Sequence, residues 1–103
     1  MAHDTHIYGE VNSRTGLKKV FRSIRRNIDQ AKARPDLTEL YKRAGYLITL
    51  THAPSWEEKF GPEAAPLRSV AEDEFSITAR KINRRARQIG EEANYDEQWG
   101  EGQ

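Results

Sequence analysis

Apolar residues recur at helical spacing in three stretches of the chain, which predicts three amphipathic helices. We expect them at about residues 15–34, 35–51 and 66–89, with a short extra helical turn at 56–60. Proline and glycine residues interrupt the pattern between these stretches. The predicted fold is therefore all-α: a small three-helix bundle with flexible termini.

The first expected helix has a narrow apolar stripe bounded by clear start and stop signals. Ser13 or Thr15 supplies an N-cap hydroxyl for a free amide of the first turn. Pro35 is expected to end the helix, because the residue before a proline, Arg34, is disfavoured in the α region. The stripe consists of Leu17, Val20, Phe21, Ile24, Ile28 and Ala31.

The second helix leaves one alternative open. Pro35 and Asp36 suit its first turn, where a proline loses no hydrogen bond and a carboxylate faces the positive end of the dipole. Gly45 weakens the helix, and residues 46–51 also alternate and are rich in strand formers, which allows an α+β fold with a short strand there. We favour a continuous helix, because the stripe keeps its phase across Gly45. The stripe consists of Leu37, Leu40, Tyr41, Ala44, Leu47, Ile48 and Thr51.

The third helix follows a break that contains its own start signals. Ser55 and Glu58 have capping-box spacing, which predicts the short turn after them. Pro66 suits the start of the long helix and Gly90 suits its C-terminal cap. Its stripe consists of Leu67, Val70, Ala71, Phe75, Thr78, Ile82, Ala86 and Ile89.

The length of 103 residues fits a single domain. We divide it into an N-terminal arm (1–13), a helical bundle (14–90) and an acidic tail (91–103). No signal peptide and no membrane span is apparent, which favours a cytoplasmic protein that does not bind membranes. A small core favours a homo-oligomer, with a dimer as the first expectation.

The formal net charge of +1 conceals a strong local separation of charge. Residues 14–43 carry a net charge of +7 and residues 80–87 a net charge of +5. Residues 57–74 carry −4, and the acidic tail carries −5. A nearly neutral total therefore does not exclude a strongly charged interface.

The cations of the first helix gather on one side instead of spreading over its solvent face. On a helical wheel they occupy an arc of about 120°, and their members are Lys18, Lys19, Arg22, Arg25 and Arg26. Arg80, Arg84 and Arg87 form a second row on the third helix. These rows could be ordinary solvated faces, a surface for an acidic protein partner, or phosphate contacts for a nucleic acid.

Aromatic residues supply a second set of candidate contacts. Trp56 and Phe60 lie at the predicted short turn, where they could close the end of the bundle or contact another chain. Trp99 and Tyr95 lie in the acidic tail. The tail could be a free solubilising segment, or it could dock on a basic row or on a partner through these rings.

Candidate chemistry is sparse. The chain has no cysteine, and His3 and His6 on the arm lack the fixed geometry that a metal site requires. His52 falls in a loop beside no evident nucleophile, and neighbouring carboxylates such as Glu57 and Glu58 diverge by 100° on a helix. No phosphate-binding loop or nucleophile motif is present. We therefore expect no catalytic residue, no metal and no cofactor.

These observations favour a small, non-enzymatic, cytoplasmic adaptor or regulatory protein that acts through protein–protein binding. The expected site is the two basic rows with the aromatic contacts, and the expected partner is an acidic protein. The alternative is a nucleic-acid-binding accessory protein that uses the basic row of the first helix.

Overall fold

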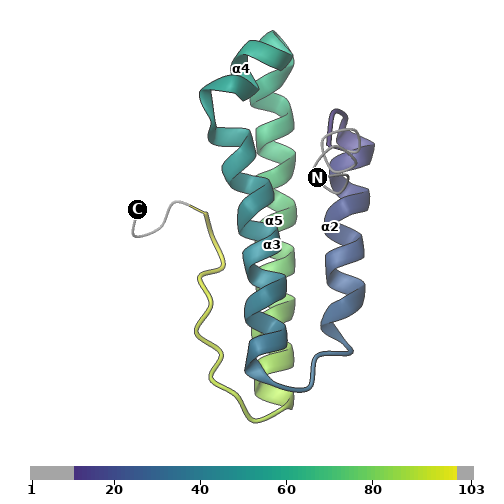
Figure 1. Cartoon of the computed structure of the whole chain (residues 1–103), viewed down its shortest axis with the longest axis vertical. Helices are drawn as coiled ribbons and strands as arrows, with labels where there is room; N and C mark the ends of the chain where they lie inside the picture. Colours follow the sequence, from purple (N-terminus) through teal and green to yellow (C-terminus); the bar gives the residue numbers. More distant parts are fainter. Residues whose placement is uncertain (1–10, 100–103) are drawn as a thin grey trace.

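Three long helices lie side by side in the computed structural model, which describes residues 11–99 (Figure 1). They are α2 (Arg14–Ile28), α3 (Arg34–His52) and α5 (Ala64–Gln88), and α3 is joined to α5 by α4 (Pro54–Phe60) and the 3-10 helix η1 (Gly61–Glu63). Helix α5 packs extensively against both α2 and α3, which contact each other less. No strand occurs in the described part of the chain, and the prediction of a small all-α bundle is confirmed.

Helix α2 begins as expected but ends early. The Ser13 hydroxyl accepts a hydrogen bond from the Gly16 amide at 3.0 Å, so Ser13 is the N-cap. The predicted end at residue 34 is wrong, because the helix stops at Ile28. Pro35 has no amide to donate to the Ala31 carbonyl, and Arg85 donates to that carbonyl instead, at 2.9 and 3.0 Å. Residues 29–33 therefore form a connection that reverses the chain.

Helix α3 runs without interruption through Gly45. The alternative of a strand at residues 46–51 is therefore not realised. Leu47, Ile48 and Thr51 are buried on the same side as the earlier members of the stripe, so a helix places all of them in the core. The apolar phase outweighs the local strand propensity.

The connection between α3 and α5 differs in detail from the prediction. Helix α4 begins at Pro54, which leaves Ser55 inside the helix and without a capping bond, so the capping-box prediction is wrong. Helix α5 begins at Ala64, two residues before Pro66. Its C-terminal cap is confirmed: Gly90 has a φ of +76°, and the amide of the next residue donates to the Ala86 carbonyl at 2.8 Å.

The predicted stripes form the core. All their members are buried except Val20, Tyr41, Val70 and Ile89, which are half-buried. Among residues 11–99, no helix is both long and apolar enough to cross a membrane. Most of the arm (residues 1–10, with both of its histidines) and the last four residues of the tail lie outside the described residues.

Candidate partner-binding face

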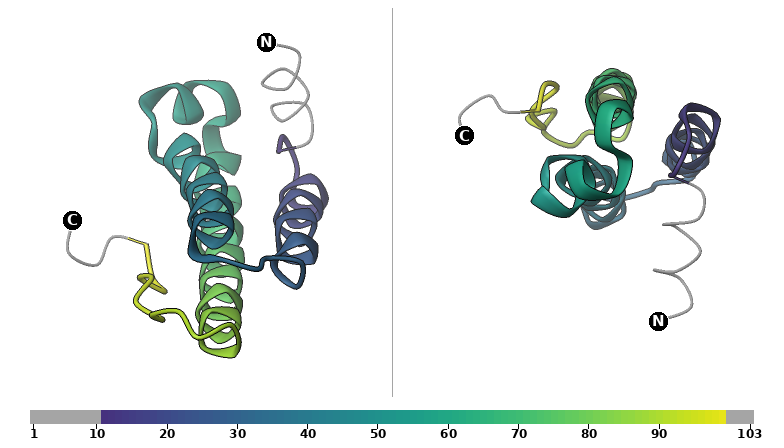
Figure 2. Two further views of the ribbon diagram at one scale, coloured as in Figure 1. Left: turned by 60° about the horizontal axis from the view of Figure 1, so that its bottom comes forward. Right: turned by 90° about the horizontal axis from the view of Figure 1, so that it is seen from above.

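The acidic tail follows α3 and α5 on the side of the bundle away from α2 (Figures 1 and 2). The Tyr95 ring lies 4.9 Å from the Tyr41 ring, measured between centroids. The Trp99 ring lies 5.9 Å from Phe75 and 6.0 Å from His52. The described part of the tail is therefore docked on the bundle, through the two rings that the sequence singled out.

Backbone groups hold the tail more than charges do. The Asn83 amide donates to the Tyr95 carbonyl at 2.8 Å and accepts from the Tyr95 amide at 3.0 Å. Arg34 donates to the Glu92 carbonyl at 2.7 Å and to the Asn94 side chain at 2.6 Å. Within the described residues, no ion pair joins residues 89–99 to the bundle. Docking of the tail on the basic row of α2 is therefore not observed, because rings and amides position it elsewhere.

We call the surface beneath the tail the tail groove; it is formed by Thr38 and Tyr41 of α3 and by Phe75 and Asn83 of α5. The Tyr41 hydroxyl donates to the Asp96 carbonyl at 3.0 Å. Burial, reinforced by the Asp96 charge, raises the pKa of Tyr41 above its ordinary value. The phenol therefore remains protonated and able to donate across the neutral pH range.

The basic row of α2 is only partly available to a partner. Arg25 forms an ion pair with Glu74 at 2.9 Å and a hydrogen bond with Thr78 at 3.1 Å, and its side chain is 17% exposed. Arg25 thus joins α2 to α5. Arg22 and Arg26 are exposed, and neither forms an ion pair with any described residue. Lys18 and Lys19 are exposed as well.

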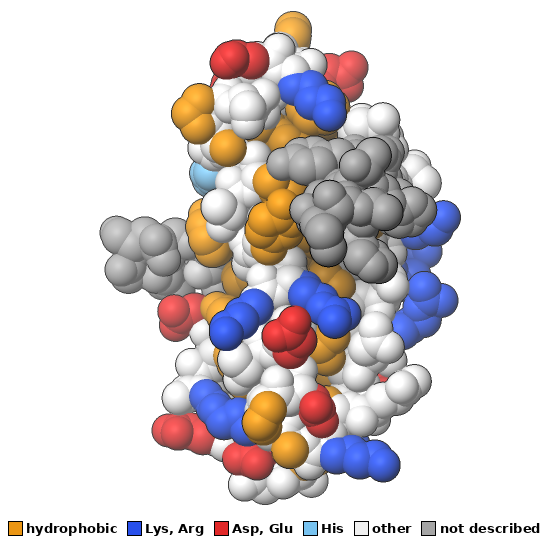
Figure 3. Space-filling model, viewed as in Figure 1, with side chains coloured by type: hydrophobic (Ala, Val, Ile, Leu, Met, Phe, Trp, Pro, Cys, Tyr) orange, Lys and Arg blue, Asp and Glu red, His pale blue; other side chains and the backbone are white. Residues whose placement is uncertain are grey.

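The second basic row lies on α5. Arg80, Arg84 and Arg87 are exposed, and none of them forms an ion pair within the described part of the chain. Their neighbour Lys81 differs, because it pairs with Asp29 of α2 at 3.4 Å. Lys and Arg side chains also gather along the edge of the molecule over α2 (Figure 3).

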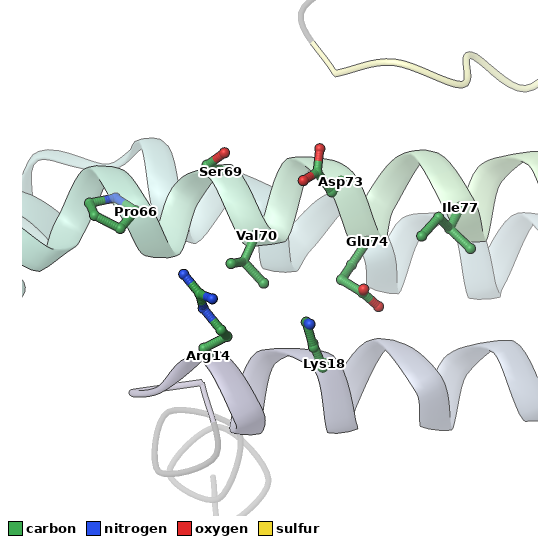
Figure 4. A pocket seen from close by; sticks show the side chains of 8 residues that line it. All are labelled: Arg14, Lys18, Pro66, Ser69, Val70, Asp73, Glu74 and Ile77. Atoms are coloured by element: carbon green, nitrogen blue, oxygen red, sulfur yellow. The ribbon is translucent and has the colours of Figure 1, made fainter.

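An open groove of about 480 Å³ lies between α2 and the exposed side of α5. Arg14 and Lys18 point into it from α2, while Val70 and Glu74 point toward α2 from α5 (Figure 4). Val70, which is half-buried, and Ile77, which is 42% exposed, lie two turns apart on α5 and form an apolar strip along the groove. The remaining lining residues are Pro66, Ser69 and Asp73.

Part of each basic row borders the groove. Arg22 lies one turn beyond Lys18 on α2, and Arg80 and Arg84 continue the Ile77 side of α5 by one and two turns. We call this surface the α2–α5 face. The sequence predicted its two rows of cations but missed the groove, because only the packing of α2 on α5 brings Arg14 and Ile77 together.

Of the two aromatic residues of α4, Trp56 is buried and Phe60 is half-buried. Trp56 is 4% exposed, and its indole donates to the Ala64 carbonyl at 3.1 Å. Its ring packs on Phe60 at 4.4 Å between centroids. These rings close the end of the bundle, so Trp56 presents no contact surface. Trp99 is half-buried against α3 and α5.

Little else in the described residues suggests chemistry. No cluster of three or more histidine, cysteine or acidic residues that could hold a metal ion occurs there. The exposed His52 ring lies 3.1 Å from the Glu72 carboxylate, beside the Trp99 ring. Comparisons with protein-family models, curated proteins and solved structures found no match to this chain.

Proposed function

We propose that this chain is a small, non-enzymatic adaptor or regulatory protein that binds an acidic, partly apolar segment of a partner protein on its α2–α5 face. One observation carries the proposal. The groove sets exposed cations beside a half-exposed apolar strip, while the chain's own acidic tail lies on the other side of the bundle.

Charge complementarity defines the partner. Lys18 and Arg22 on α2 and Arg84 on α5 attract carboxylates, and an arginine can bind both oxygens of one carboxylate. Such pairs speed encounter and fix orientation more than they raise affinity. Burial of Ile77 and Val70 by apolar side chains of the partner would add the larger stabilising contribution.

The same face suits a protein segment better than a nucleic acid. Asp73 and Glu74 also line the groove. The negative groups of any ligand therefore have to lie beside Arg14 and Lys18, and a peptide can space its carboxylates to do so. Phosphate contacts also make no use of an apolar strip. A peptide can place its apolar side chains on the strip and its carboxylates near Arg14 and Lys18.

The test uses two labelled peptides of equal charge, one alternating glutamate with leucine and one alternating glutamate with serine, and a DNA duplex. We expect the leucine peptide to bind most tightly in fluorescence anisotropy. Lys18→Glu should weaken that binding by about tenfold. Lys42→Glu, the same charge change at an exposed site on α3, is the matched control and should leave it within about twofold.

Ile77→Ser should abolish the preference for the leucine peptide and leave binding of the serine peptide unchanged. Equal binding of both peptides by the natural chain would contradict a mixed apolar and basic site. Tighter binding of the duplex, with a steep dependence on salt, would favour the nucleic-acid alternative. A loss caused equally by Lys18→Glu and Lys42→Glu would show that only overall charge matters.

A further inference from the structure

We propose that the tail groove also receives the tail of a second copy of this chain, so that two copies exchange residues 91–99 and form a symmetric dimer. The inference rests on Asn83, a buried asparagine that hydrogen-bonds the backbone of the tail, and on two ring contacts beside it. It is independent of the partner proposed for the α2–α5 face, which lies on another side of α5.

Asn83 is the centre of the recognition. It is 3% exposed near the C-terminal end of α5, and its amide bonds both the N–H and the C=O of Tyr95. A third bond joins it to the Glu97 carboxylate at 2.8 Å. Buried polar side chains in proteins nearly always have hydrogen-bond partners, and the tail supplies those of Asn83. The partner here is backbone, which is identical in every copy of the chain.

The ring contacts supply the register. Tyr95 lies under the Arg34 guanidinium at 4.9 Å, and its hydroxyl is 2.7 Å from the Thr38 hydroxyl. Trp99, four residues further, lies against Phe75. The tail groove therefore accepts a segment with two aromatic rings four residues apart. The tail of any copy of this chain is such a segment. A second copy is therefore the occupant that the observations favour.

The tail can leave the bundle without opening its core. Residues 91–99 supply no buried member of the core, which is made by Val11, the helices and their connections. Ala93, Tyr95 and Trp99 only pack against its outside. The return of the chain toward the groove depends on the reversal at Gly90, with its φ of +76°. An element that docks through its own contacts after a short hinge is the kind that identical protomers exchange.

Concentration decides between the two arrangements. A tail attached to its own bundle has an effective concentration on the order of millimolar, so a single copy retains its tail in dilute solution. Exchange becomes favourable at high concentration or when the reversal is prevented. The exchanged dimer would carry two α2–α5 faces, which would make the module bivalent.

Sedimentation of Gly90→Pro against Gly90→Asn tests the proposal. Proline cannot take a positive φ and drives Ile89 to an extended conformation, so the reversal is lost, whereas asparagine tolerates it. At about 100 µM, well below the millimolar effective concentration, we expect twice the monomer mass for Gly90→Pro and a monomer for Gly90→Asn. The natural chain should be monomeric when dilute and partly dimeric near about 1 mM.

Adding Asn83→Ala to Gly90→Pro should return the chain to a monomer of unchanged helical circular dichroism. A monomeric Gly90→Pro chain, or a dimer that persists after Asn83→Ala, would overturn the proposal. So would a natural chain that is still monomeric at the highest concentration. A monomeric Gly90→Pro chain that binds a free peptide of residues 91–99 would instead make the groove a site for other proteins.

Discussion

Helix α5 has a groove on each of two sides, and the two grooves differ in nearly every respect. The tail groove is filled by the chain itself and uses ring contacts, backbone hydrogen bonds and the buried Asn83. The groove toward α2 is open and has cations and carboxylates around a half-exposed apolar strip. No ion pair within the described residues thus holds the acidic tail, and most of the basic surface remains exposed to solvent. The total charge of +1 results from segments of opposite charge that nearly cancel.

The largest expected effect comes from the filled groove. Asn83→Ala removes three hydrogen bonds at a buried position and should lower the free energy of unfolding by about 2–3 kcal/mol. Urea unfolding measures this loss, and Trp99 emission should shift toward that of a solvent-exposed indole. The exposed Asn27, which bonds only to its own helix, provides the control Asn27→Ala, expected within about 0.5 kcal/mol of the natural chain. Equal effects of the two variants would contradict a specific role for Asn83.

In the basic row of α2, we expect Arg25 to contribute to stability and Arg22 to contribute to binding. Arg25→Ala leaves the 11% exposed Glu74 carboxylate without its partner and should cost about 2 kcal/mol of stability. Arg22→Ala, three residues earlier, should change stability by less than about 0.5 kcal/mol but weaken binding of the acidic leucine peptide. The account would be wrong on this point if Arg25→Ala were as stable as Arg22→Ala.

The sequence predicted the helices through their apolar stripes, because a wrong phase would expose several large side chains at once. It failed where the outcome depended on a partner distant in the chain. Helix α2 ends at Ile28, and Arg85, more than fifty residues away, donates to the carbonyl of Ala31 in the connection that follows. The position of Pro35 alone does not predict that the helix ends as early as Ile28.

The candidate site was predictable only as a set of charges. Helical spacing places Lys18, Arg22 and Arg25 in one row, but it does not show that Glu74 will pair with Arg25 and bury it. The tail is similar. The sequence left open a free solubilising tail, docking on a basic row or docking on a partner. The contacts of Asn83, an ordinary polar residue in the sequence, were not predicted.

Salt should affect the two grooves differently. Raising ionic strength from about 50 to about 500 mM should weaken binding of the acidic peptide by about tenfold, because its charge pairs are near solvent and screened. Docking of the tail should change little, since no described ion pair holds it. Fluorescence anisotropy of the labelled peptide follows its binding. Trp99 emission, recorded in a Trp56→Phe background, follows docking of the tail. Parallel loss of both signals with salt would remove the distinction between the grooves.

The smallest effect concerns pH. Since burial raises the pKa of Tyr41 in the folded chain, the phenolate is less favourable there than in the unfolded chain. The contribution to stability is therefore fully present below the ordinary tyrosine pKa of 10.0 and is lost as the pH rises through the raised value. Tyr41→Phe should remove this part of the alkaline loss. An identical alkaline profile for Tyr41→Phe and the natural chain would contradict the assignment.

The central claim is that the acidic tail lies on α3 and α5 and leaves the α2–α5 face open. Nuclear Overhauser contacts in the natural chain test it most directly, because they report which protons are neighbours in solution. The account predicts contacts from the Trp99 indole to Phe75 and His52, and from the Tyr95 ring to Thr38 and Tyr41, unchanged by added salt. Contacts from the tail to Lys18 or Arg22, or none to α3 and α5, would contradict it.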